Sequence, residues 1–163
     1  MTIYIKNKYR LIIDDFSFKC AVGKNGISRN KIEGDKKTPE GLFNIEHLYY
    51  RKDRLKKPIT NLKSIDIKRN MGWCDDSNST SYNKLIQIKK HIKYEKLFRR
   101  DHKYNLLIPI KYNFKKPIKN RGSCIFIHLT NNYKPTAGCI SLKKNDFLIL
   151  LRLINRKTKI QIN

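Results

Sequence analysis

The stretch GSCIFIHLTNNYKPTAGCISL, Gly122–Leu142, decides the fold that we predict for this chain. Its first part, Cys124–Leu129, is rich in β-branched and aromatic residues and predicts a strand, and Cys139–Leu142 predicts a second one. The polar residues Thr130–Gly138 between them predict a loop. Because successive side chains of a strand alternate, Cys124, Phe126 and His128 share one face, and His128 lies near the end of its strand.

Short runs of similar composition occur throughout the chain. They predict strands over Ile3–Ile5, Leu11–Ile13, Phe16–Val22, Leu42–Ile45, Tyr104–Tyr112 and Lys159–Ile162. Pro109 lies inside one of these runs and favours an edge position or a bulge there, since proline donates no ladder hydrogen bond. Most of the chain is therefore expected to be β-structure.

Helical signals are few. We predict a short helix over Tyr94–Arg100 and a second one over Asp146–Ile154, with Asn145 as its N-cap. Residues 51–83 are basic, interrupted by Pro58 and Gly72, and are predicted to be irregular. No internal repeat or low-complexity linker divides the chain, so residues 1–163 are expected to form one β-rich α+β domain.

The charge of the chain is strongly positive. Its 163 residues include 37 Lys and Arg against 13 Asp and Glu, a formal net charge of +24, and only four of the acids are Glu. Residues 51–122 hold 21 of the basic residues against six acids, so an anionic partner is expected on this segment. A non-catalytic basic module that binds nucleic acid or an anionic wall polymer is thus one hypothesis. The lysines are scattered without regular aromatic interleaving and no nucleic-acid motif occurs, which argues against nucleic acid.

Two further classes of protein receive little support. No apolar run approaches the ~20 residues that cross a bilayer, and the first residues, MTIYIKNKYRLIID, are typical of a strand and not of a signal peptide. The four cysteines are far apart and form no C-x-x-C pair, so we predict no structural zinc site, no metal and no cofactor. They are Cys20, Cys74, Cys124 and Cys139.

One pair of residues in Gly122–Leu142 has the chemistry of nucleophilic catalysis. A strand-end imidazole at His128 and a thiol at Cys139, predicted to lie near the start of a helix, favour a thiolate, because an imidazolium or a helix N-terminus lowers the pKa of a thiol. Gly138 allows close approach of the backbone, and the N–H groups of Gly138 and Cys139 are then candidates to bind an oxyanion.

A structural interpretation of these residues is equally simple, and spacing alone favours it. A cysteine after a glycine is more often a small buried hydrophobic residue, and a strand-end histidine is often only hydrogen-bonded. Cys124 competes for the nucleophile's role, but on one strand it would lie roughly 13 Å from His128, which favours a place in the core.

Gly122–His128 and Pro135–Leu142 together resemble the active-site block of the L,D-transpeptidase catalytic domain family, the YkuD-like fold. Other parts of the chain resemble family motifs in the same order. They are the GD-x-x-TP-x-G signature at Gly34–Gly41, the GWCDD segment at Gly72–Asp76 with Tyr82 and Asn83, the run Asp101–Tyr104, and Tyr112 with Asn113.

The resemblance implies a YkuD-like β-sandwich or mixed barrel and a cysteine acyltransferase that acts on peptidoglycan stem peptides. It implies Cys139 as the nucleophile, His128 as the general acid and base, and Gly138 as part of the oxyanion site. It also implies work in the cell envelope or periplasm, with the cytoplasm as the alternative because no signal peptide is visible. The oligomeric state is left open.

The chain departs from the better-known branch of the family at two positions. Ala137 stands where that branch has a second histidine, and Ser141 stands at its last polar position, so this chain resembles a short branch. The departures leave the acyl acceptor open. An amine acceptor makes the enzyme a transpeptidase, whereas water makes it an L,D-carboxypeptidase.

Five residues are candidates for substrate binding. Asp75 and Asp76 are adjacent acids in a basic segment, and with Trp73 they would hold an ammonium group; the alternative is that they cap a turn and Trp73 packs in the core. Arg121 would pair with a substrate carboxylate, although a solvated arginine is the simpler interpretation. Thr136 precedes the predicted nucleophile and is the fifth candidate.

Overall fold

Alternating aliphatic side chains build one large mixed sheet in the computed structural model, which describes residues 1–163. In spatial order its ten strands are β6 (Gly41–Asn44), β15 (Lys159–Ile162), β1 (Thr2–Lys6), β2 (Arg10–Ile13), β3 (Phe16–Ala21), β14 (Ile140–Leu142), β13 (Phe126–Leu129), β12 (Leu106–Pro109), β7 (Leu48–Tyr50) and β8 (Ser64–Asp66). In β1, for example, Ile3 and Ile5 are buried while Tyr4 faces solvent. The large sheet therefore has one apolar face.

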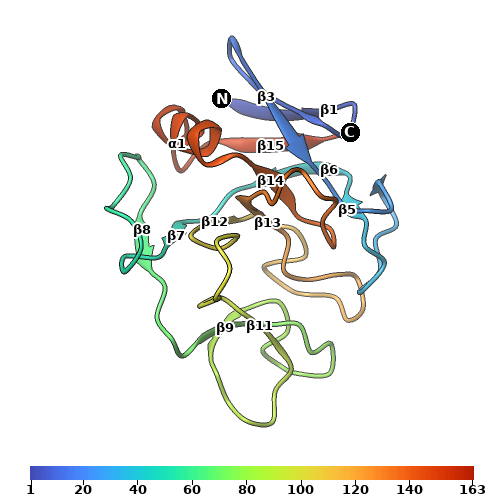
Figure 1. The fold of residues 1–163 in the computed structure, drawn as a ribbon. Helices are drawn as coiled ribbons and strands as arrows, with labels where there is room; N and C mark the ends of the chain where they lie inside the picture. The colour runs from blue at the N-terminus through green and yellow to red at the C-terminus, as the bar shows by residue number, and fades with distance from the viewer.

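This sheet curls into a half-barrel, visible around the centre of Figure 1. Beyond the end of β6, Ile45 forms an isolated bridge with Ile110, which follows β12. The N–H of Lys111 also donates to the carbonyl oxygen of Asn44 at 2.8 Å. Strands that are far apart in the strand order thus meet, and the apolar face is turned inward.

The helix α1 (Lys144–Leu153) belongs to this core. Its buried side chains, Phe147, Leu150 and Leu151, join a cluster of 25 buried residues contributed mainly by the large sheet. Asp146 in its first turn and Arg152 in its last turn complement the helix dipole.

Two smaller sheets complete the fold. β9 (Met71–Cys74) lies between β10 (Leu85–Gln87) and β11 (Tyr94–Lys96), and β4 (Ile27–Ser28) pairs with β5 (Thr38–Pro39). Figure 1 shows β9 and β11 at the opposite end of the molecule from β1 and β15. A second buried cluster of nine residues, rich in aromatic side chains and cysteine, includes Trp73 of β9 and Phe126 of β13.

The predicted fold class is confirmed, because the chain is mostly β-structure with a single short helix. The helix predicted over Tyr94–Arg100 is wrong: β11 occupies Tyr94–Lys96, and Glu95 pairs with Trp73 across the small sheet. Pairing with a distant strand has overridden the local helical preference of this segment.

Three boundaries also differ from the predictions. Residues 51–83 contain β8 and β9 and are not wholly irregular. The N-cap of α1 is Lys143, not Asn145, and it makes no side-chain capping hydrogen bond. β13 begins at Phe126 because Cys124 adopts a positive φ of 55°, which ends extended pairing there.

All four cysteines are free and buried. The structure contains no helix with the length and apolar character that crossing a membrane requires.

Candidate active site

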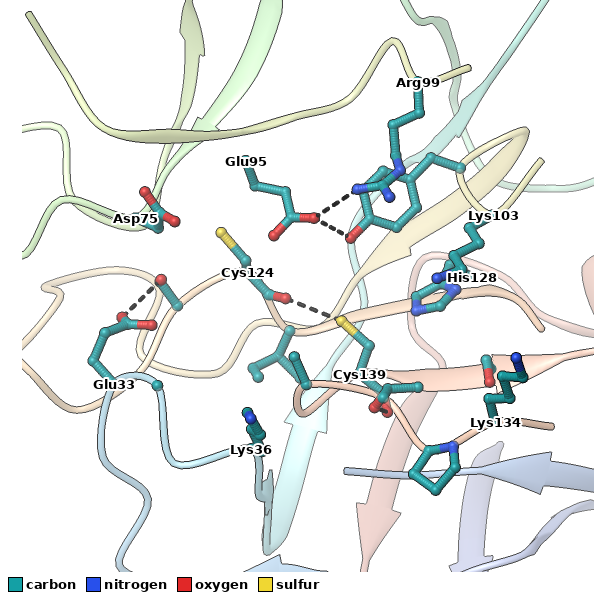
Figure 2. Close-up of a pocket in the computed structure, with 18 of the residues that line it drawn as sticks. Glu33, Lys36, Asp75, Glu95, Arg99, Lys103, Cys124, His128, Lys134 and Cys139 are labelled. Atoms are coloured by element: carbon teal, nitrogen blue, oxygen red, sulfur yellow. Dashed lines mark hydrogen bonds and ion pairs between the residues drawn. The ribbon is translucent and has the colours of Figure 1, made fainter. Parts of the chain in front are cut away.

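The strands β13 and β14 bring the predicted catalytic pair together. They are parallel neighbours, with His128 opposite Ser141. Cys139 precedes Ser141 by two positions, so the side chains of Cys139 and Ser141 project from the same face of the sheet. His128, opposite Ser141, projects from that face as well. His128 and Cys139 both line a cavity of about 430 Å³ (Figure 2).

The hydrogen bond of His128 fixes the tautomer of its ring. Nδ1 lies 2.9 Å from the carbonyl oxygen of Leu129, and since a carbonyl only accepts, Nδ1 carries the proton. The neutral ring therefore presents an unprotonated Nε2. The residue is 6% exposed, and burial, with the cations Lys103 and Arg99 adding to it, lowers the pKa of His128 to about 4. His128 is thus a neutral base at physiological pH.

Cys139 is also buried and is 7% exposed. Its thiol donates to the carbonyl oxygen of Cys124 at 3.2 Å, and its Sγ accepts the N–H of Phe126 at 3.4 Å. Burial, with Glu95 adding to it, raises the pKa of the Cys139 thiol to about 12.

The prediction of a lowered thiol pKa is therefore wrong. Cys139 leads directly into β14, and α1 begins only at Lys144, so no helix N-terminus stabilises a thiolate here. At physiological pH the site holds a protonated thiol and a neutral imidazole.

The loop before Cys139 requires glycine at position 138. Gly138 has a φ of +141°, and a Cβ there would lie 2.8 Å from the carbonyl oxygen of Lys37. Thr136 ties this loop together: its Oγ1 accepts the N–H of Gly138 at 3.1 Å and donates to the carbonyl oxygen of Cys139 at 2.6 Å. The N–H of Gly138 is therefore engaged, whereas the N–H of Cys139 donates to no group of the chain.

A buried ion pair lies next to the loop that contains Gly138. The Lys31 side chain is 3% exposed, and its Nζ lies 2.7 Å from Oδ1 of Asp35, the acid of the GD-x-x-TP-x-G motif. The lysine stem packs against Gly122, where a Cβ would lie 2.8 Å from Cε. The same motif thus fixes a cation close to Gly138 and the cavity.

Two glutamates in the cavity wall are held by internal donors. Glu33 accepts hydrogen bonds from the hydroxyls of Tyr82 and Ser123, the latter at 2.8 Å. Glu95 accepts from the Tyr104 hydroxyl at 2.7 Å and from Arg99 at 3.3 Å. The positions of both carboxylates are therefore set by the surrounding chain, as Figure 2 shows for Glu95 and its two partners.

Asp75 is the third carboxylate of the cavity and differs from the glutamates. Its Oδ1 is shielded from solvent and has no hydrogen-bond partner. Burial raises the pKa of Asp75, and the negative Glu33 nearby adds to this shift while Lys93 opposes it. Asp75 thus lines the cavity, while its unpartnered Oδ1 is shielded from solvent.

Lysines line the cavity as well. Lys103 and Lys134 lie on the His128 side in Figure 2, while Lys36 lies below Cys139. Neither Lys103 nor Lys134 takes part in an ion pair, in contrast to Arg99, which pairs with both Glu95 and Asp101.

The five predicted substrate residues are not all at the cavity. Asp75 and Thr136 line it. Trp73 is 2% exposed in the aromatic cluster, and Oδ1 of Asp76 accepts the N–H of Asn78 in a turn at 3.0 Å. Arg121 is exposed and does not line the cavity. Trp73 thus packs in the core, Asp76 caps a turn and Arg121 is solvated, which are the alternatives given for these three residues.

Asn83 explains why the GWCDD and YN motifs occur together. Its Oδ1 accepts the indole N–H of Trp73 at 2.9 Å and the backbone N–H of Cys124 at 3.1 Å. Its amide donates to the carbonyl oxygens of Tyr112 and Asn113. One buried side chain thus joins the small sheet to the segment that leads into β13.

Several residues of the cavity were not predicted from the sequence. Two of the four glutamates in the chain, Glu33 and Glu95, line it, and the scarcity of Glu was the signal that would have singled them out. Lys103 lies inside the motif run Asp101–Tyr104, whereas nothing in the sequence distinguishes Lys134 from the other lysines.

The curled sheet forms a β-rich domain, and its cavity holds a thiol, an imidazole and both signs of charge. The family model of the L,D-transpeptidase catalytic domain, YkuD, matches residues 1–162, and the chain belongs to this family. The resemblance found in the sequence is thereby confirmed over almost the whole chain, and with it L,D-transpeptidase-type catalysis on cell-wall peptidoglycan as the general activity. No curated protein and no solved structure matched the chain.

Proposed function

We propose that this protein is an L,D-transpeptidase in which Cys139 is the nucleophile and His128 is the general acid and base. The observation that carries the proposal is the placement of the two side chains on neighbouring strands at one cavity, with Nε2 of His128 unprotonated. A neutral base beside a protonated thiol is the starting state of a general-base-assisted attack.

In the first step, Sγ of Cys139 attacks the carbonyl carbon of an L,D-peptide bond while its proton passes to Nε2 of His128. The C–N bond then breaks, and the imidazolium returns the proton to the leaving amine, so that a thioester and a terminal D-amino acid result. The high thiol pKa favours this coupled transfer over a preformed thiolate, because an isolated buried anion is costly.

The backbone N–H of Cys139 is the proposed oxyanion donor, since it is not used within the chain. Gly138 contributes its conformation, which aims this N–H group, while its own N–H is bonded to Thr136.

In the second step an amine of a neighbouring stem peptide attacks the thioester and forms a cross-link. Water in place of the amine would give L,D-carboxypeptidase activity through the same acyl-enzyme.

The intact mass of the protein after incubation with a tetrapeptide donor or a carbapenem tests the proposal. We expect a covalent adduct that peptide mapping places on Cys139, no adduct in the Cys139→Ala variant, and an adduct on Cys139 in the matched Cys124→Ala variant. An adduct that persists in Cys139→Ala contradicts the assignment. Analysis of the released products separates cross-linked dimers from tripeptide and thus decides the acceptor.

We further propose that residues 1–163 act as one catalytic domain at the cell envelope, where the substrate polymer lies. Cell fractionation with an antibody against the chain, compared with activity on isolated peptidoglycan, tests this location.

A further inference from the structure

A second charged surface lies outside the cavity, on the solvent face of β1, β2 and β3. Ile5 and Leu11 are buried, so their neighbours in these strands point outward. The register places Lys6 opposite Arg10 and Arg10 opposite Lys19, and all three side chains are exposed. Three cations thus stand side by side across three strands, and we call them the cation ladder.

The cation ladder is electrostatically unfavourable by itself, because like charges directly opposite each other on neighbouring strands destabilise a sheet. None of its three residues takes part in an ion pair, and Arg10 donates only to the hydroxyl of Ser17, at 3.4 Å. The acids of the β2–β3 turn, Asp14 and Asp15, begin four residues after Arg10, roughly 13 Å along the strand. A bound anion would therefore relieve a repulsion that the chain leaves uncompensated.

A groove of about 690 Å³ continues from the cation ladder, and Lys19 belongs to both. The other cations of the groove are Lys8 and Lys24, and no acid is among its lining residues. Lys8 reaches over the loop between β3 and β4, where a Cβ on Gly26 would lie 3.5 Å from its Nζ. The cation ladder and the groove together form one continuous row of five cations.

Tyr133 of the β13–β14 loop forms one wall of the groove. The Nζ atoms of Lys19 and Lys143 lie 4.6 and 5.5 Å from the centroid of its ring, so this ring is engaged by cations. Asp146 lies near Tyr133 and, after burial, adds to its raised pKa, but Asp146 does not line the groove. Tyr9 is the one other aromatic residue of the groove, whereas sites for single-stranded nucleic acid stack successive bases on several rings. The groove therefore favours an anion without bases.

The arrangement of the five cations suits a linear ligand. Neighbouring strands lie about 4.8 Å apart, so the cation ladder alone spans about 10 Å, and the groove extends the row further. A single small anion does not contact all of these side chains, but a chain with one charge in each repeat does. Four of the five cations are lysines, whose compact charge binds phosphate oxygens without the fixed geometry of a guanidinium group.

We propose that the cation ladder and the groove bind a linear phosphodiester polymer without bases. The site goes beyond the proposed function and does not depend on Cys139, because the groove and the cavity share only Pro135 among their lining residues. Bound polymer would hold the domain at a polyanionic surface and leave the cavity open. The partner is thereby placed on the N-terminal strands and not on residues 51–122, where the sequence concentrates its basic residues.

Binding of labelled poly(glycerol phosphate) to the full chain, followed by fluorescence anisotropy, tests the proposal. The ladder variant combines Lys6→Gln, Arg10→Gln and Lys19→Gln. We expect it to bind about fiftyfold more weakly than wild type, and the slope of log affinity against log salt between about 50 and 200 mM to become shallower by about 2.

A matched control removes the same charge elsewhere. It combines Lys52→Gln, Lys56→Gln and Lys57→Gln, three exposed lysines of the 51–122 segment that line neither the cavity nor the groove. We expect the control to lose less than about threefold in affinity, because it lowers only the overall attraction of the protein for a polyanion.

A charge reversal separates lost binding from lost folding. Arg10→Glu places a carboxylate between Lys6 and Lys19, so we expect a higher melting temperature at low salt together with polymer binding more than about tenfold weaker. A folding defect lowers both quantities and so does not imitate this result.

Three results would overturn the proposal: no binding of poly(glycerol phosphate) by wild type, wild-type affinity in the ladder variant, or an equal loss in the control. Tighter binding of an oligothymidylate of equal charge, or binding to phosphatidylglycerol vesicles alone, would assign the surface to nucleic acid or to a membrane and overturn the polymer assignment. Acylation of Cys139 by a soluble donor should keep its wild-type rate in every variant. Failure of that acylation in wild type overturns the proposed function and leaves the polymer site standing.

Discussion

The two buried clusters of this protein differ in composition and in what they do. The core of the half-barrel holds 25 residues, mostly Ile and Leu, whereas the cluster beneath the cavity holds nine, among them Trp73, Tyr104, Phe126 and Cys139. Aliphatic side chains have no polar groups to satisfy, whereas the Trp73 indole N–H and the Tyr104 hydroxyl need hydrogen-bond partners. The first cluster stabilises the sheet, and the second positions polar groups of the site.

The contacts of the aromatic cluster show how this works. The ring of Tyr104 meets both Phe126 and His128 edge to face, at centroid distances of 5.8 and 5.3 Å, while its hydroxyl holds Glu95. One side chain therefore packs the base of the site and also places a carboxylate in the cavity wall. Substitutions in the two clusters are expected to have different consequences.

The largest expected effect concerns the thiols of the two clusters, Cys20 and Cys139. Burial raises the pKa of each to about 12 from 9.0, so below pH 9 each holds about a thousandfold less thiolate than an unburied thiol. Because the thiolate is the reactive form, alkylation of Cys139 by iodoacetamide should rise about tenfold per pH unit from pH 7 to 10 without a plateau near pH 9. Mass spectrometry measures the rate, with Cys139→Ala as the control, and a plateau below pH 8 would contradict the raised pKa.

In the aliphatic core, Leu150→Ala is expected to lower the free energy of unfolding by about 3 kcal/mol, since it leaves a cavity in α1's buried face. Ile149→Ala on the same helix removes a side chain that is 38% exposed and should cost less than about 1 kcal/mol. Urea denaturation of both variants measures the difference. Equal losses would show that α1 is not packed as described.

In the aromatic cluster, Asn83→Ala should cost about 2 kcal/mol, because the N–H groups of Trp73 and Cys124 lose their acceptor. Unlike Leu150→Ala, it should also slow acylation of Cys139 under conditions where the variant is folded. The measurement is the acylation rate at low temperature, where circular dichroism verifies the fold. An unchanged acylation rate would show that the hydrogen bonds of Asn83 do not affect the site.

The smallest expected effect is that of Tyr104→Phe, which keeps the ring and removes the bond to Glu95. We expect a loss of about 1 kcal/mol in unfolding free energy, and Tyr4→Phe on the exposed face of β1 should change nothing measurable. Thermal denaturation compares the two variants. A loss in Tyr4→Phe as large as that in Tyr104→Phe would indicate that the hydroxyl bond to Glu95 carries no stability.

Much of the fold could be predicted because strand patterns are local. The runs at Ile3–Ile5, Leu11–Ile13 and Lys159–Ile162 alternate as half-buried strands do, and the structure places β1, β2 and β15 there. The segment Tyr94–Arg100 was predicted wrongly because its strand depends on pairing with β9, about twenty residues earlier in the chain, and local preference does not report such pairing.

The candidate site was predictable to the same degree. His128, Gly138 and Cys139 stand within one short stretch, and the resemblance of this stretch to the family's active-site block, not its spacing alone, indicated their chemistry. The pKa of Cys139 was predicted in the wrong direction, because it depends on how deeply the folded chain buries the thiol.

The sequence by itself determined the strands that alternate locally, such as β1, β2 and β15, together with the motifs and the family, because these depend on which residue types follow one another along the chain. Only the tertiary structure decided which charges face the thiol. Glu33, Asp75 and Glu95 are separated by about twenty residues or more and line one cavity together with Lys103 and Lys134. Burial and Coulomb interactions act through space, and their balance exists only once distant segments have packed together.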